Sequence, residues 1–217
     1  MSSILKLLRL DKALIKPYNK YFLVIFLAPL IVIYSYKEFI PGIVFSMIMM
    51  SMTSAYTFTI AEKNDINRLY GLLPVSKKDI VLGRYIFTAI LGFAGAFIAI
   101  IMNAIILTLA KIPLKTDDIL YGFGAGLILY FFFTGVQLPG YFKLGSIKGR
   151  FLSFIPLVGL FFMGELVKAL DLTDSYGFTI EVLNNPYGML ACSILLCIAL
   201  YGVSIGITQK IYGAMEL

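Results

Sequence analysis

The chain has 217 residues, of which 60% are hydrophobic and only 14% are charged, and its mean hydropathy is +0.92. A soluble domain has about 45–50% apolar and about 25% charged residues, so this composition excludes an ordinary soluble protein and predicts an integral membrane protein. The net charge of +6 comes from basic residues in short segments between apolar runs. Such residues set membrane topology, and they do not predict a nucleic-acid-binding surface.

Six apolar stretches approach or reach the roughly 17 to 25 residues that are needed to cross about 30 Å of hydrocarbon. They are residues 21–36, 40–61, 85–110, 119–138, 151–167 and 187–208. The first and the fifth are short, and each contains a proline, Pro29 and Pro156. We therefore predict an all-α fold with six transmembrane helices, which forms a single membrane domain over residues 1–217.

The distribution of Lys and Arg predicts the orientation. Of the 18 basic residues, 14 lie in the N-terminal segment, the second and fourth connections and the C-terminal tail, which leaves Lys37, Lys111, Lys115 and Lys168. Because basic residues are retained on the cytoplasmic side, both termini are expected in the cytoplasm of a multi-pass plasma membrane protein.

Residues 1–18 precede the first span and are predicted to form an interfacial helix. Basic side chains share one face of a helical wheel, whereas apolar ones occupy most of the other face, with Asp11 among them. The basic residues are Lys6, Arg9, Lys12 and Lys16. We expect this helix to lie on the inner leaflet with its basic face toward anionic lipid headgroups. A solvated cap on the bundle is the alternative.

Several residues inside the spans are assigned structural roles. Gly122 with Gly126, and Gly92 with Ala96, have the small-xxx-small spacing that lets helix backbones approach closely. The amides of the third and fourth spans are expected to join helices by hydrogen bonds, and the aromatic run 130–133 to face lipid. Cys192 and Cys197 are expected on different faces of one helix, so neither a disulfide nor a metal pair is predicted.

The second connection, residues 61–79, is more elaborate than a simple linker. Ile66, Leu69, Tyr70 and Leu73 recur at helical spacing and form an apolar face that could dock into a groove of another protein. Gly71 and Pro74 end this predicted helix. Ser76 and Asp79 then form a capping-box pattern that begins the helix of the third span.

This connection resembles the first cytoplasmic connection of small ABC-2 type permeases. The resemblance is carried by an acidic residue that leaves the second span, a short helix, and then Leu-Leu-Pro-Val-Ser-Lys-Lys-Asp-Ile-Val-Leu-Gly-Arg-Tyr over residues 72–85. Six spans, an N-terminal interfacial helix and cytoplasmic termini are also similar to that family. Among its members, the small permeases that export amphipathic peptides, such as phenol-soluble modulins or peptide antibiotics, are the most similar in kind.

The resemblance implies that residues 62–73 are a coupling helix that binds a separate ATPase subunit. It implies that the partner is contacted by Glu62, Asp65, Ile66, Arg68, Leu69, Tyr70, Leu72, Leu73 and Pro74. It further implies an assembly of two ATPases with two permeases, which are either identical copies or sister chains. Amphipathic peptide cargo would pass between the permeases along their second and fifth spans.

No phosphate-binding loop of the Gly-x-x-x-x-Gly-Lys-Ser/Thr type occurs in the chain. Residues 145–150 have the composition of such a loop but not its spacing. We therefore expect no cofactor in this chain, and we expect ATP and Mg²⁺ to be bound by the partner subunit.

The predicted pathway residues lie in the second and fifth spans. Ser46, Met50, Thr53 and Thr57 form a narrow stripe of hydroxyl and thioether groups on one helix face, which would suit varied apolar cargo. The alternative is that these hydroxyl groups bond the carbonyls of the preceding turn. Glu165 is the one acidic residue within a span, and it has either a cargo or gating role or a structural role near the outer interface.

Three other classes of protein are weighed against an exporter permease. An ATP-independent secondary transporter or channel usually concentrates buried charges and broken helices near the bilayer midplane. An intramembrane enzyme is disfavoured because the chain contains no histidine and no paired acids within its spans, so no catalytic or metal site is predicted. A membrane scaffold is the remaining alternative.

Overall fold

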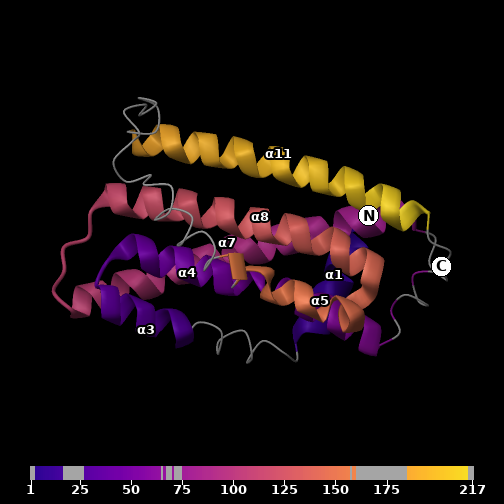
Figure 1. The fold of residues 1–217 in the computed structure, drawn as a ribbon, viewed down its shortest axis with the longest axis horizontal. Coiled ribbons are helices and arrows are strands. Elements are labelled where there is room, and N and C mark those ends of the chain that lie inside the picture. The colour runs from indigo at the N-terminus through magenta and orange to yellow at the C-terminus, as the bar shows by residue number, and fades with distance from the viewer. Residues whose placement is uncertain are drawn as a thin grey trace.

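The computed structural model describes residues 3–16, 27–64, 66, 70, 75–156, 158–159 and 185–214. Within these residues the structure is helical, and the elements form one elongated bundle (Figure 1). The helices are α1 (Ser3–Ile15), α3 (Leu27–Tyr36), α4 (Phe39–Ser51), α5 (Ser54–Lys63), α7 (Lys77–Leu109), α8 (Thr116–Lys148), the 3₁₀ helix η2 (Gly149–Phe154) and α11 (Pro186–Gly213).

Four helices in the described residues are long and apolar enough to cross a membrane, judged by length and composition. They are Phe39–Lys63, Lys77–Leu109, Thr116–Lys148 and Pro186–Gly213, and they correspond to the predicted second, third, fourth and sixth spans. The first predicted span is described only from Leu27 onward and the fifth only in its first part, so these two spans stay predictions.

The two longest helices extend well beyond their apolar runs. α7 and α8 have 33 residues each, which corresponds to about 50 Å of helix. About 30 Å of this length is needed to cross hydrocarbon. The extra turns of α7 begin at Lys77, where Ser76 accepts a hydrogen bond from the backbone N–H of Asp79, as the capping-box pattern predicts.

α8 lies between α11 and the helices of the second span (Figure 1). Small residues allow this close approach, because a Cβ atom at Gly122 or Gly126 would contact Ile43, and one at Gly126 would also contact Met47 of α4. Gly92 of α7 similarly faces the ring of Tyr130. The predicted packing role of these glycines is confirmed.

Tyrosine hydroxyl groups join α7, α8 and α11. Tyr130 donates to the carbonyl oxygen of Thr88 at 2.8 Å, and the hydroxyl groups of Tyr201 and Thr134 lie 2.8 Å apart. The expectation that the aromatic run 130–133 faces lipid is therefore wrong for most of the run. Three of its four residues are buried, because Tyr130 fills the space beside Gly92 and Phe131 packs on the ring of Tyr201. Phe132 is 47% exposed.

The second span is interrupted near its middle. α4 ends at Ser51 and α5 begins at Ser54, and the backbone N–H groups of Met52 and Thr53 bond the carbonyl oxygens three residues earlier. This local change to a tighter turn places Ser51, Thr53 and Ser54 in one fully buried group. Ser54 donates to Oε1 of Gln137 at 2.7 Å, so this amide does connect two helices, as predicted. Asn103 instead donates to the carbonyl oxygen of Ala99 in its own helix, so the prediction is wrong for this amide.

Candidate functional site

One end of the bundle brings together segments that are far apart in the sequence. Lys77 at the start of α7 donates to the carbonyl oxygen of Gly213 at the end of α11. Glu62 at the end of α5 reaches Ser146 at the end of α8, and Arg84 of α7 reaches Asp11 of α1. We call this the basic end, because it gathers the N-terminal helix, the second and fourth connections and the C-terminal tail. Both chain termini lie there in Figure 1.

A buried cation organises the basic end. The guanidinium of Arg84 lies 3.0 Å from the carboxylate of Asp11, and the two side chains are only 4% and 1% exposed. The same guanidinium donates to the hydroxyl group of Tyr70 at 3.4 Å and stacks 5.3 Å above the ring of Phe58. Arg84 therefore contacts α1, α5 and the 62–73 segment at once, and the planar guanidinium suits such multiple contacts.

Burial changes the acidity of two partners of Arg84. Desolvation raises the pKa of the Asp11 carboxyl above its ordinary value, and the charge of Arg84 opposes this shift only in part. Desolvation also raises the pKa of the Tyr70 hydroxyl, with Arg84 again acting in the opposite direction. The phenol thus stays protonated, and it receives a hydrogen bond from Arg84 as a neutral group.

The orientation of α1 explains why an acid interrupts its apolar face. Leu7, Asp11 and Ile15 are buried against the bundle at a spacing of four residues. The basic residues predicted to share one face, Lys6, Arg9, Lys12 and Lys16, are all exposed or partly exposed on the opposite side. α1 is therefore attached to α5 and α7 through its apolar face, while contact of its basic face with lipid stays a prediction.

Glu62 makes a second connection at this end. Its Oε2 accepts hydrogen bonds from the backbone N–H of Ser146, at 3.0 Å, and from the Ser146 hydroxyl group. α8 changes direction immediately before, at Gly145, whose φ is 76°. A carboxylate in this position caps the helical turn that begins at Ser146, because the first N–H groups of a turn have no partner within it.

Most of the predicted partner-binding residues lie outside the described residues. These are Asp65, Arg68, Leu69, Leu72, Leu73 and Pro74. Of the remainder, Ile66 and Tyr70 are buried against the bundle, and Glu62 is partly buried. The structure therefore gives the places of Glu62, Ile66 and Tyr70, and the role of this set stays a prediction.

The predicted pathway stripe of the second span lies inside the bundle. Ser46, Met50, Thr53 and Thr57 are all buried, and the three hydroxyl groups donate to carbonyl oxygens of the preceding turn at 2.7 Å. This is the local bonding that the alternative interpretation describes. Glu165 lies outside the described residues, so a pathway role for the five residues stays a prediction.

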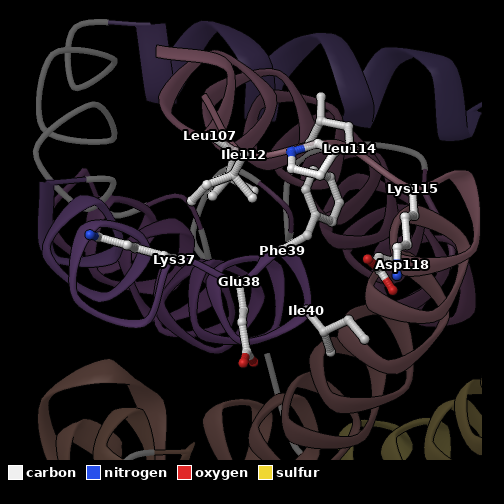
Figure 2. A pocket seen from close by; sticks show the side chains of 10 residues that line it. Lys37, Glu38, Phe39, Ile40, Leu107, Ile112, Leu114, Lys115 and Asp118 are labelled. Carbon is white, nitrogen blue, oxygen red and sulfur yellow. The ribbon is translucent and has the colours of Figure 1, made fainter. Parts of the chain in front are cut away.

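A pocket of about 370 Å³ opens at the opposite end of the bundle, between the α3–α4 and α7–α8 connections. Its apolar lining includes Phe39 and Leu107, and its rim carries two lysines and two acids. Figure 2 shows the side chains of Lys37 and Glu38 pointing in different directions. Lys115 and Asp118 lie close together in Figure 2, whereas Lys37 and Glu38 point elsewhere, so the four charged groups do not surround one point.

The residues that sequence reasoning missed are Arg84, Ser146 and Gly145. The count of basic residues places Arg84 in the second connection, whereas in the structure it is buried in α7. The clue was Asp11, an acid within the apolar face of a basic helix, which requires a buried cation as its partner. Within the residues described, no three His, Cys, Asp or Glu side chains are placed to hold a metal ion.

Comparison with known proteins gives one match. A family model described as ABC-2 family transporter protein matches residues 6–213, which is nearly the whole chain. No curated protein and no solved structure matches the chain in the other two comparisons.

Proposed function

Because this chain belongs to the ABC-2 transporter family, we propose that it is the membrane-spanning permease of an ATP-driven exporter, whose ATPase is a separate subunit. The family is one of transport membrane subunits, and the match over residues 6–213 is the observation that carries the proposal. In this proposal residues 62–73 bind the ATPase, and ATP binding drives the spans from an inward-facing to an outward-facing arrangement.

The arrangement of the basic end supports this use of the 62–73 segment. Two described residues of the segment are tied into the bundle, because Glu62 bonds Ser146 and Tyr70 bonds Arg84. A segment that is attached in this way transmits a push on its surface to the helices instead of moving independently. The exposed basic face of α1 lies at the same end and supports placement of that end in the cytoplasm, beside anionic lipid.

The assembly and the cargo are further parts of the proposal. Two permeases, as a homodimer or as sister chains, would combine with two ATPases in the plasma membrane, with both termini in the cytoplasm. We propose amphipathic peptides as cargo, which pass along the second and fifth spans near Ser46, Met50, Thr53, Thr57 and Glu165. The interruption of the second span beside the buried hydroxyl groups gives this helix a point at which it can bend.

The test is co-purification of the chain from native membranes with a nucleotide-binding protein, followed by measurement of ATP hydrolysis in liposomes. Leu72→Asp should abolish ATP turnover that depends on the permease. Leu72 is a predicted partner contact that lies off the helical face of the buried residues Ile66 and Tyr70, and a charge there disrupts an apolar contact. Tyr70→Asp is unsuitable, since Tyr70 is buried against Arg84. Leu114→Asp, at the opposite end of the bundle, is the matched control and should leave turnover unchanged.

Unchanged ATP turnover in Leu72→Asp would overturn the docking role. Transport by liposomes that contain only this chain would favour an ATP-independent transporter. In the part of the chain that the structure describes, the interrupted second span is a feature that such a transporter would share.

A further inference from the structure

Glu62 is the residue at which the second connection touches the fourth. We propose that Glu62 is a positioning residue that transmits displacement of the 62–73 segment to the turn after Gly145, and so to the start of the predicted fifth span. This inference rests on the proposed function, because it needs an ATPase that moves the segment. It gives Glu62 a role within the chain in place of a contact to the partner.

Glu62 is mechanically part of the segment that the ATPase would move. It lies in the last turn of α5, which ends at Lys63, and Asn64 closes the helix by donating its backbone N–H and side-chain amide to the carbonyl oxygen of Ile60. Ile66, four residues after Glu62, is buried against the same bundle. In the proposal, a displacement of the segment is therefore passed to the last turn of α5 and displaces the carboxylate.

The other partner of the contact sits where α8 can bend. Gly145 adopts φ 76° and ψ 176°, and a Cβ atom there would collide with Oε1 of Glu62. This backbone conformation is favourable only for glycine. Ser146 then begins a new helical turn, and its N–H and hydroxyl groups both bond Oε2 of Glu62. The carboxylate thus determines where the new turn begins.

The turn is held against α8 on its other side. Leu152 of η2 packs over Gly140 so closely that a Cβ atom at Gly140 would overlap its side chain. The same leucine also contacts the position of Gly149. With Leu152 fixing one side and Glu62 the other, η2 has a defined place at the entrance to the fifth predicted span. Moving Glu62 shifts one of the two supports.

The geometry also distinguishes Glu62 from its neighbour Lys63. Both carboxylate oxygens of Glu62 face Gly145 and Ser146, whereas Lys63 is exposed. The charge that caps Ser146 is therefore engaged within the chain, and Lys63 presents its ammonium to the surroundings.

The experiment uses the complete complex of the chain with its nucleotide-binding subunit. Amide hydrogen exchange is measured with and without ATP and Mg²⁺ in wild type, Glu62→Gln and Ser146→Ala, with Glu38→Gln as a control that removes an exposed acid at the opposite end. In wild type, we expect nucleotide to change exchange both in residues 62–73 and in residues 146–154. In Glu62→Gln, the change in 62–73 should persist while the change in 146–154 is lost.

Loss of the charged acceptor should also accelerate exchange of the Ser146 amide by about tenfold, as expected for a hydrogen bond to a charged group. A merely structural role would lower the yield of complex without separating the two responses. A Glu62→Gln complex with the wild-type response in both segments overturns the inference and leaves the proposed function intact. Absence of any nucleotide-binding subunit from the wild-type preparation overturns the proposed function instead.

Ser146→Ala provides the second variant, because it keeps the backbone N–H bond and removes only the hydroxyl bond. We expect a weakened nucleotide response in residues 146–154. If Glu62→Gln does not assemble and Ser146→Ala responds as wild type does, Glu62 is a folding contact and the inference is wrong.

Discussion

Replacing Arg84 by methionine isolates the energetic effect of a carboxylate buried without its cation. Methionine keeps much of the apolar volume but leaves Asp11, which is 1% exposed, without the guanidinium at 3.0 Å. The buried carboxylate can then lose its unpaired charge only by binding a proton. Arg84→Met should therefore destabilise the fold, and the size of the loss should depend on pH.

The size of the loss in stability follows from the free energy that is needed to protonate Asp11. The ordinary pKa of Asp11 is 3.8, so protonating it at pH 7 costs about 4 kcal/mol at 1.36 kcal/mol per unit. At pH 5 the same step costs only about 1.6 kcal/mol. Burial already raises the pKa of Asp11, and loss of Arg84 raises it further. The contribution of Asp11 to stability is then fully present below pH 3.8 and is lost as pH rises through the folded-state pKa.

The assay is thermal unfolding in detergent micelles of Arg84→Met and of the double variant Asp11→Asn with Arg84→Met. Both variants lack the contacts of Arg84 with Tyr70 and Phe58, so their difference reports the carboxylate alone. We expect the double variant to be more stable by up to about 4 kcal/mol at pH 7, which is about 10 °C in Tm for a chain of this size.

The difference in the free energy of unfolding between the double variant and Arg84→Met should narrow to at most about 1.6 kcal/mol at pH 5. Asp11→Asn alone is the control, and it should cost less than Arg84→Met because the amide still offers an oxygen to Arg84. A gap that is below about 1 kcal/mol at pH 7, or that is independent of pH, would refute the reasoning.

Two further predictions concern backbone and packing, and both are measured as changes in Tm. Lys111 follows the end of α7 and has φ 58°, a conformation that favours glycine. The backbone N–H groups of Lys111 and Ile112 donate to the carbonyl oxygens of Thr108 and Leu107. Lys111→Gly should therefore stabilise the fold by about 0.5–1 kcal/mol. Lys115→Gly is the control and should not stabilise, since Lys115 has φ −98°. Gly126→Ala should destabilise by about 1–2 kcal/mol, because its Cβ would lie 2.9 Å from Cγ of Met47. At Gly202 the added Cβ would have no neighbouring atom of the described residues within 4 Å, so Gly202→Ala should be neutral or stabilising. Equal effects of the two alanines would contradict this packing argument.

Local chemistry made parts of this fold predictable. The start of α7 was predictable because Ser76 accepts a hydrogen bond from the backbone N–H of Asp79, three residues further on. The glycine contacts of α8 were predictable from spacing alone, since small residues at helical intervals have few uses other than close packing. The family was recognised from the order of residues in the second connection, and the match over nearly the whole chain confirms it.

The remainder depends on contacts that no local pattern encodes. Hydropathy does not distinguish a ring that faces lipid from a ring between two helices, so the burial of Tyr130 and Phe131 was missed. The interruption at Met52 is also hidden, because serine and threonine are tolerated in continuous membrane helices as well. In the sequence, residues 145–150 have only the composition of a phosphate-binding loop, and nothing marks Gly145 as the point at which α8 bends.

Asp11 shows how an exception to a pattern can be more informative than the pattern. An acid among the apolar residues of an amphipathic helix costs several kcal/mol unless a cation reaches it, so its presence predicts a tertiary contact without naming the partner. That partner, Arg84, lies near the start of the third predicted span and also bonds Tyr70. In the proposed exporter, a push on the 62–73 segment would divide between Tyr70 and Glu62. Tyr70 would pass it through Arg84 to α7 and α1, and Glu62 would pass it through Ser146 to η2. Because Arg84 contacts three elements, α7 and α1 would move together, whereas η2 would follow its own two supports, Glu62 and Leu152.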